Sequence, residues 1–231
     1  MSKIFAFILD LIFPIKCLDC GKEGDWLCDK CFKKIKFQEN QLCPVCHKQE
    51  KNGRLCPACR RQKSIDALLI ACHYQDEIVQ KIIHFLKYRY VRGLRPLFGR
   101  MLAEFISRNN FGPFQNFFIL PIPLHKKRER FRGFNQAEII AEELAKIIKI
   151  PVNKNILRRS KHTSAQANLK AKQRSKNIKN AFVLASGLEI MGKSAILIDD
   201  VYTTGSTMNE AAGVLKKAGV KEIIGFVIAK G

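Results

Sequence analysis

The stretch from Ala195 to Thr207 reads AILIDDVYTTGST, and it constrains the possible folds of the chain more than any other part. A short apolar run, Ala195 to Ile198, ends at two adjacent carboxylates, Asp199 and Asp200, as a buried parallel strand does when it emerges at a site. A loop rich in hydroxyl groups follows and opens a helical pattern from Met208 to Ala218. This order of strand, loop and helix predicts an α/β domain with a mostly parallel sheet.

The loop after the two acids also predicts a phosphate-binding site. Its free backbone N–H groups, its hydroxyl groups and the positive end of the helix dipole all favour a phosphate group. The loop residues are Thr203, Thr204, Gly205, Ser206 and Thr207. The two acids beside the loop suit ribose hydroxyl groups or a divalent metal, so we expect a sugar phosphate at this site.

Two other phosphate-site patterns fit less well. The segment Gly187 to Ser194, GLEIMGKS, matches the phosphate-loop pattern G-x-x-x-x-G-K-[ST], but a true phosphate loop leaves a strand and opens a helix. This segment opens onto the strand that starts at Ala195, so we predict a turn. Paired acids also occur in receiver domains and Walker B strands. A receiver domain has its acid pair near its start, whereas here only one further strand, Ile223 to Ala229, follows.

Eight of the nine cysteines form four C-x-x-C pairs. The pairs are Cys17 with Cys20, Cys28 with Cys31, Cys43 with Cys46, and Cys56 with Cys59. Each pair can offer two thiolates to a tetrahedral zinc ion, so eight ligands predict two closed, structural Cys₄ sites. Sequential pairing is the simplest arrangement. An interleaved pairing stays open because the gap from Cys20 to Cys28 is short.

The chain is strongly basic, with a formal net charge of +21 and a pI near 9.8. Such a charge favours a polyanionic partner such as nucleic acid, although solubility alone is an alternative. The apolar stretch from Ile4 to Phe13 is too short to span a bilayer and has no small-residue cleavage site after it. We therefore expect a helix that packs on the main domain, no membrane span and a cytoplasmic protein.

Basic residues concentrate in two tracts. Five of the seven residues from Lys126 to Arg132 are basic. We interpret this run as a loop, and like charges at this density are stabilised by an anionic ligand. From Leu144 to Leu188 the chain has eleven lysines and arginines and no acid, which suggests a hydrophilic hood over an anion or a nucleic-acid backbone. A third stretch, Lys87 to Arg95, interleaves tyrosines with cations. Side chains in this pattern can stack on nucleic-acid bases, but the same pattern occurs as often at a solvated junction between two helices.

The ordered motifs together resemble the ComF family over essentially the whole chain. They are the apolar N-terminal segment ending in Phe-Pro, the tandem C-x-x-C pairs, LKYRYVRG, PIPLHKKRERFRGFNQAE, the pattern from Arg159 to Phe182, and LIDDVYTTGST. Within this set, LIDDVYTTGST is similar to the ribose-phosphate signature of type I phosphoribosyltransferases. One departure lies in the hood, where Ser164 and Ala165 precede Gln166 instead of the expected proline.

The resemblance implies roles for individual residues. Asp199 and Asp200 would hold the ribose 2′ and 3′ hydroxyls of phosphoribosyl pyrophosphate, and residues 203–207 would hold its 5′-phosphate. Lys126, Arg130 and Arg132 would receive the pyrophosphate, with magnesium as a possible further cofactor. Family members act in natural transformation on incoming single-stranded DNA, beside the uptake helicase.

These observations predict a double zinc-ribbon module over residues 1–62 and a phosphoribosyltransferase-like domain over 63–231. We expect a DNA-uptake factor that binds phosphoribosyl pyrophosphate and single-stranded DNA. The alternative is an active phosphoribosyltransferase acting on an unidentified base or amine, and a purely structural adaptor is a third, weaker hypothesis. Catalytic activity, acceptor and oligomeric state are not decided by the sequence.

Overall fold

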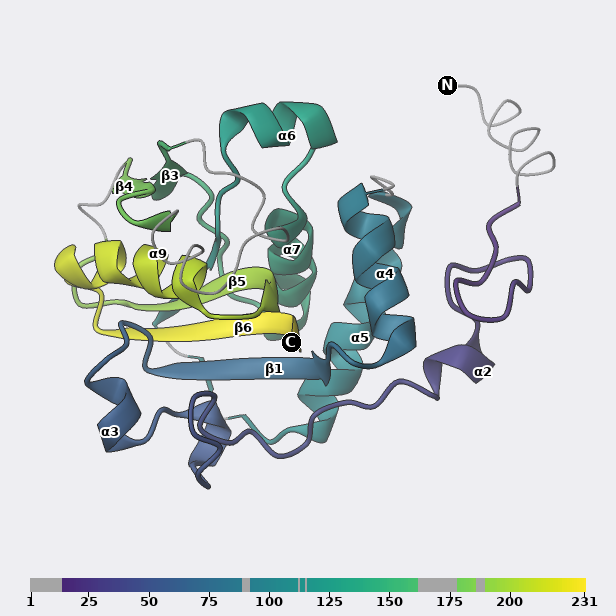
Figure 1. The fold of residues 1–231 in the computed structure, drawn as a ribbon, viewed down its shortest axis with the longest axis horizontal. Helices are drawn as coiled ribbons and strands as arrows, with labels where there is room; N and C mark the ends of the chain where they lie inside the picture. Colours follow the sequence, from purple (N-terminus) through teal and green to yellow (C-terminus); the bar gives the residue numbers. More distant parts are fainter. Residues whose placement is uncertain (1–13, 89–91, 112, 115, 162–177, 186–189) are drawn as a thin grey trace.

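The computed structural model describes residues 14–88, 92–111, 113–114, 116–161, 178–185 and 190–231 (Figure 1). Its elements in chain order are α2 (Asp29–Phe32), the 3₁₀ turn η1 (Lys51–Gly53), α3 (Pro57–Arg60), β1 (Ala67–His73), α4 (Glu77–Tyr88), η2 (Arg92–Leu94), α5 (Arg95–Arg108), β2 (Phe117–Pro121), α6 (Lys126–Arg132), α7 (Gln136–Ile148), β3 (Leu157–Arg159), β4 (Phe182–Leu184), β5 (Ser194–Tyr202), α9 (Ser206–Lys217) and β6 (Glu222–Lys230). No helix within these ranges has the length and apolar character that crossing a membrane requires.

Four strands form the central sheet in the order β1-β6-β5-β2, and each neighbouring pair is parallel. Along the inner strand β5, Ala195 and Leu197 contribute to one hydrophobic core, whereas Ile196 and Ile198 contribute to the other. A parallel strand buried on both faces reads as an unbroken apolar run, which is how β5 stands out in the sequence. The predicted α/β fold with a parallel sheet is confirmed.

Helices cover both faces of the sheet (Figure 1). Side chains from α4, α5 and α7 pack on one face, and α9 packs on the other together with the small antiparallel sheet of β3 and β4. Strands β2 and β5 are parallel neighbours, with Phe117 beside Ser194, so their carboxyl ends lie at the same end of the sheet. In a sheet of this kind, ligands bind at the carboxyl ends of the strands.

Two local expectations were wrong. Strand β5 does not stop before the acid pair but continues through it to Tyr202, because β6 offers partners as far as Lys230. The basic run from Lys126 to Arg132 is a helix, α6, and not a loop. The His125 side chain accepts a hydrogen bond from the backbone N–H of Lys127 at the start of α6, and Gly133 ends the helix in the left-handed conformation (φ 74°).

Other expectations fall partly or wholly outside the described residues. The segment Ile4 to Phe13 and, in the predicted hood, residues 162–177 and 186–188 are outside them. In the GLEIMGKS stretch, only residues 190–194 are described. There the Lys193 N–H donates to the Ile190 carbonyl in a turn that leads into β5, so the described part does not open a helix.

The N-terminal part of the chain covers the edge of the sheet. Strand β1 has a partner on one side only, and an uncovered edge of this kind invites pairing with another chain. The chain from α2 runs along β1, with bridges from Phe37 to Cys72 and from Arg54 to Ala67 (Figure 1). Between these bridges, the Gln41 side-chain amide donates to the Ile70 carbonyl and accepts from the Ile70 N–H, at 3.1 and 2.9 Å.

Candidate functional site

The paired cysteines come together as two clusters in sequential order. The Sγ atoms of each cluster lie within 4.8 Å of one another, in the groups Cys17, Cys20, Cys28, Cys31 and Cys43, Cys46, Cys56, Cys59. Two Sγ–Sγ separations, 3.7 Å from Cys20 to Cys28 and 3.6 Å from Cys46 to Cys56, test the fit to zinc. Thiolates about 2.3 Å from a tetrahedral zinc ion lie roughly 3.8 Å apart, so both clusters fit. The chain therefore has two Cys₄ zinc-binding sites, and the interleaved pairing is excluded.

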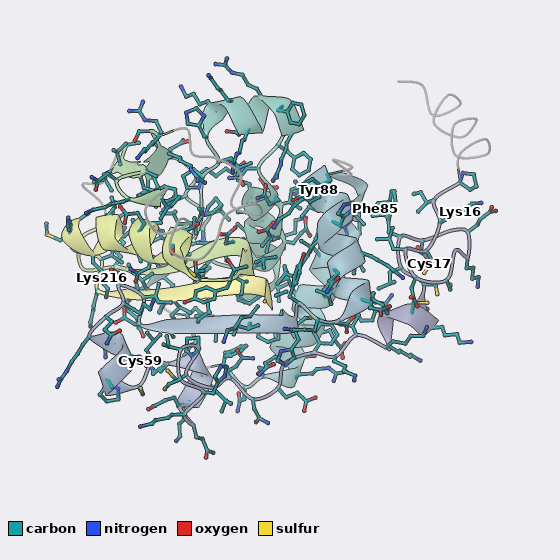
Figure 2. The ribbon with its side chains drawn as sticks, viewed as in Figure 1. Lys16, Cys17, Cys59, Phe85, Tyr88 and Lys216 are labelled. Atoms are coloured by element: carbon teal, nitrogen blue, oxygen red, sulfur yellow. The ribbon has the colours of Figure 1, made fainter. Side chains whose placement is uncertain are left out.

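The two clusters lie on different sides of the molecule, as the labels of Cys17 and Cys59 show (Figure 2). The first packs beside α5, where the Arg100 guanidinium lies 3.7 Å from the centre of the Phe32 ring and 2.8 Å from the Asp29 carboxylate. The second lies in the segment that covers β1. No cysteine of either cluster lines the cavity described next, which agrees with a structural role.

A cavity of about 570 Å³ opens at the carboxyl end of β5. Its walls come from α4, α6, β3, the end of β5 and the loop that opens α9. The sequence-predicted residues that line it are Asp199, Asp200, Thr203, Thr204, Gly205, Ser206, Thr207 and Arg132. The other two candidates, Lys126 and Arg130, are exposed and do not line it.

The acid pair has a cationic partner that local sequence patterns did not indicate. Lys87 of α4 places its Nζ 2.9 Å from Oδ2 of Asp200, whose side chain is only 5% exposed. Burial and the neighbouring charge of Asp200 raise the pKa of Asp199 to about 7. Burial acts to lower the pKa of Lys87, but the Asp200 carboxylate outweighs it and leaves that pKa raised. Near neutral pH, Lys87 therefore carries its positive charge, and the Asp199 carboxyl group is partly protonated.

The hydroxyl-rich loop is shaped by one glycine. Gly205 adopts the left-handed conformation (φ 72°) directly before α9, and a Cβ atom there would lie 2.1 Å from the Tyr202 hydroxyl. The loop therefore turns tightly and brings the start of the twelve-residue helix α9 to the cavity. The hydroxyls of Thr204 and Ser206 lie 2.9 Å apart on this turn. Hydroxyl groups and helix N–H groups together form a setting suited to phosphate.

An arginine cluster forms the opposite wall. Arg128 and Arg132 project from α6 one helical turn apart, and Arg159 comes from β3. Burial and the charge of Arg132 lower the pKa of Arg128, while Tyr88 opposes them. Burial and the charge of Arg128 lower the pKa of Arg159 to about 10, although Asp199 opposes them. Such crowded positive charge is relieved by a bound anion.

Sequence reasoning missed three cavity residues: Lys87, Arg128 and Arg159. Helical periodicity through α6 would have placed Arg128 on the same face as Arg132 and apart from Lys126 and Arg130. Lys87 and Arg159 lie in basic stretches that the sequence already singles out, but their place in the cavity follows only from the tertiary packing of α4 and β3.

We expect Asp199→Asn to stabilise the free protein at pH 8. In the unfolded chain this carboxyl titrates with a pKa near its ordinary value of 3.8, and in the folded protein its pKa is about 7. Between these values the folded state holds a proton that the unfolded state has lost, so the stability falls as the pH rises from about 4 to about 7. The substitution removes that loss, which corresponds to about 4 kcal/mol at pH 8 for a shift from 3.8 to about 7.

Urea unfolding of the wild type and Asp199→Asn, followed between pH 5.5 and 8, checks this expectation. The wild type should lose stability relative to the variant across that range. A constant difference between the two proteins would show that Asp199 does not titrate there.

Matches to known families agree with this arrangement. Residues 8–63 match the double zinc ribbon domain, and residues 132–231 match the phosphoribosyl transferase domain. The parallel sheet, the two cysteine clusters and these matches define a double zinc ribbon joined to a phosphoribosyltransferase-like domain.

The chain is similar to curated proteins named for competence and DNA utilization. It is 47% identical to competence protein F of Haemophilus influenzae over 106 residues, which cover 46% of each chain. It is 31% identical to DNA utilization protein YhgH of Salmonella typhimurium over 62% of this chain and 63% of that protein. It is 27% identical to competence protein ComFC of Bacillus subtilis over 86% of this chain and 81% of that protein. Together, these matches support the assignment of the chain to the ComF family.

The matched stretch spans about half the length of the Haemophilus relative and less than two thirds of the Salmonella one. Among solved structures, a glutamine phosphoribosylpyrophosphate amidotransferase from B. subtilis complexed with ADP and GMP is 17% identical over 58% of this chain and 25% of that chain, with a TM-score of 0.37. A purine phosphoribosyltransferase from Pyrococcus horikoshii is 17% identical over 62% of this chain and 84% of that chain, with a TM-score of 0.31.

Proposed function

We propose that this protein is a ComF-like DNA-uptake factor that binds phosphoribosyl pyrophosphate and single-stranded DNA. The observation that carries the proposal is the cavity itself, which brings an acid pair, a hydroxyl-rich loop and an arginine cluster around one space. A ligand that fits must present hydroxyl groups to the acids and anionic groups to both other walls. Phosphoribosyl pyrophosphate has hydroxyls, a phosphate and a pyrophosphate on one ribose.

In this proposal each wall of the cavity binds one part of the ligand. Asp199 and Asp200 accept hydrogen bonds from the ribose hydroxyls, and residues 203–207 bind the 5′-phosphate. Arg128, Arg132 and Arg159 bind the pyrophosphate, because they line the cavity where Lys126 and Arg130 do not. Magnesium would bind pyrophosphate oxygens, since it prefers oxygen ligands and often retains phosphate groups among them.

The DNA part of the proposal is supported by the names of the relatives and by the charge of the chain. Proteins named for competence and DNA utilization are similar to it, and its net charge is +21. Single-stranded DNA entering a cell would meet this protein in the cytoplasm, beside an uptake helicase as a further partner. Binding through the DNA backbone should weaken steeply with salt, because counterions are released.

Separate titrations of the zinc-loaded protein with phosphoribosyl pyrophosphate and with single-stranded DNA test the two bindings. At a ligand concentration of 100 Kd, phosphoribosyl pyrophosphate should stabilise the folded state by about 2.7 kcal/mol, seen as a rise in Tm. The double variant Asp199→Asn, Asp200→Asn should lose this rise. Ribose 5-phosphate and pyrophosphate, each alone, should give smaller rises.

The two bindings can fail independently. An unchanged Tm at millimolar phosphoribosyl pyrophosphate would remove the sugar-phosphate ligand from the proposal. Absence of measurable DNA binding at 50 mM salt, or binding that does not change with salt, would remove single-stranded DNA.

An active phosphoribosyltransferase is the second candidate, and the arginine cluster favours it. If pyrophosphate leaves from C1 of the ribose, negative charge develops on the leaving group, and preorganised arginines would stabilise it. Pyrophosphate release measured with a panel of nucleobases and amines tests this candidate. Release that survives in the double variant Asp199→Asn, Asp200→Asn would exclude these acids from the reaction.

A further inference from the structure

We propose that a base of single-stranded DNA stacks at the mouth of this cavity, against Tyr88 of α4 and Phe131 of α6. This inference rests on the proposed function and deepens it, because it places the DNA strand at the same cavity that would hold the sugar phosphate.

Highly exposed phenylalanine and tyrosine rings occur at this mouth and at no other place in the described ranges. Large hydrophobic side chains with high exposure there are Val45, Leu184, Met191, Tyr88 and Phe131. Two of the five are aromatic, and both line the cavity. Phe131 is 79% exposed and Tyr88 is 50% exposed, although the chain buries most of its large apolar side chains. Aromatic rings exposed to water beside a binding cavity can stack on a planar ligand.

The two rings come from helices on different sides of the cavity. Tyr88 is the last residue of α4, at the end of that helix nearest α6 (Figure 2). The His84 ring, one turn earlier, lies 4.9 Å from the Tyr88 ring at an interplanar angle of 38° and also lines the cavity. Phe131 lies on α6 between Arg128 and Arg132. A base that enters here would therefore meet aromatic surface from both helices and guanidinium groups beside it.

The charge outside the cavity indicates that the base belongs to a strand and is not a free nucleobase. Lys126, Lys127 and Arg130 on α6 are exposed, and so are Arg158 and Lys161 at the neighbouring β3. Figure 1 places α6 and β3 on the same side of the sheet, at the top of the view. These cations lie outside the cavity lining, so a base or mononucleotide in the cavity would not use them. A strand can stack one base at the mouth and lay its phosphates across them.

This arrangement also accounts for Lys126 and Arg130. They belong to the basic run that predicted an anion site, yet they do not face the cavity. When a DNA strand lies on α6, Arg128 and Arg132 bind the sugar phosphate, and the exposed Lys126 and Arg130 bind the DNA backbone. One short helix then contacts both ligands.

The experiment compares fluorescently labelled oligo(dT) with an abasic strand of the same length, by anisotropy at fixed salt. Phe131→Ala and Tyr88→Ala should each weaken oligo(dT) binding by about 5- to 150-fold, the range for loss of one stacking aromatic. The matched control is Met191→Ala, because Met191 is 77% exposed and does not line the cavity. It should bind oligo(dT) as the wild type does, and Phe131→Trp should restore binding.

The abasic strand makes the test independent of whether a variant folds well. It should bind the wild type more weakly than oligo(dT), and it should not distinguish the wild type from Phe131→Ala. Both alanine variants should keep the Tm rise with phosphoribosyl pyrophosphate. Equal affinity of the wild type for the abasic strand and oligo(dT) would overturn the inference, as would full competition by dTMP at the concentration of the strand.

Failure of the inference and failure of the proposed function give different results. If the wild type binds oligo(dT) and both aromatic variants bind it equally well, the function stands and the stacking site is wrong. If the wild type binds no DNA at all, the DNA part of the function is wrong and the inference falls with it.

Discussion

Replacing Cys43 and Cys46 with serine will lower the zinc content to one ion or fewer per chain and abolish cooperative thermal unfolding. A structural zinc site contributes about 10 to 16 kcal/mol in zinc-finger peptides, which is comparable to the whole stability of a typical domain. Here the loss would spread into the sheet, because the segment that carries the second cluster also hydrogen-bonds to β1 through Gln41. The exposed edge of β1 would then promote aggregation.

Zinc release measured with a chromogenic chelator, together with thermal unfolding by circular dichroism, checks this prediction. The control is Cys72→Ala, because Cys72 is fully buried and belongs to neither cluster. It should keep two zinc ions per chain and a cooperative transition at a lower temperature. Two zinc ions in the double serine variant, or an unchanged transition, would contradict the prediction.

Lys87→Met should destabilise the folded protein by about 3 to 5 kcal/mol at pH 8, since it leaves the buried Asp200 carboxylate without its cation. The loss should shrink as the pH falls toward 6. Without Lys87, which acts to lower it, the pKa of Asp199 rises further in the folded state, so the folded variant takes up a proton that the unfolded chain does not. Stability therefore increases as the pH decreases over this range.

Urea unfolding at pH 8 and pH 6 measures both effects, and a double-mutant cycle assigns them. In an Asp200→Asn background, Lys87→Met should cost much less, because little buried negative charge then remains uncompensated. An equal loss in both backgrounds would mean that Lys87 stabilises the fold through the packing of its carbon chain alone.

The sequence alone determined the features that are encoded in short stretches. The apolar run before Asp199, the hydroxyl loop and the following helix pattern predicted an α/β unit with a cavity at the end of β5, and the structure has that unit. The C-x-x-C pairs predicted two Cys₄ sites, because a turn of four residues already places two thiolates for one metal.

Only the tertiary structure decided which residues meet. Lys87 lies far from Asp200 in the chain, and their ion pair exists because the end of α4 reaches the cavity at the carboxyl end of β5. The end of β5 depends on how far β6 continues as its partner, so the apolar run could not show that Asp199 and Asp200 lie within the strand. The sequence of the basic run from Lys126 to Arg132 shows its charge but not which of its side chains face the cavity. Its folding as a helix sends Arg128 and Arg132 into the cavity and Lys126 and Arg130 out to solvent, because residues four apart share a face and residues two apart do not.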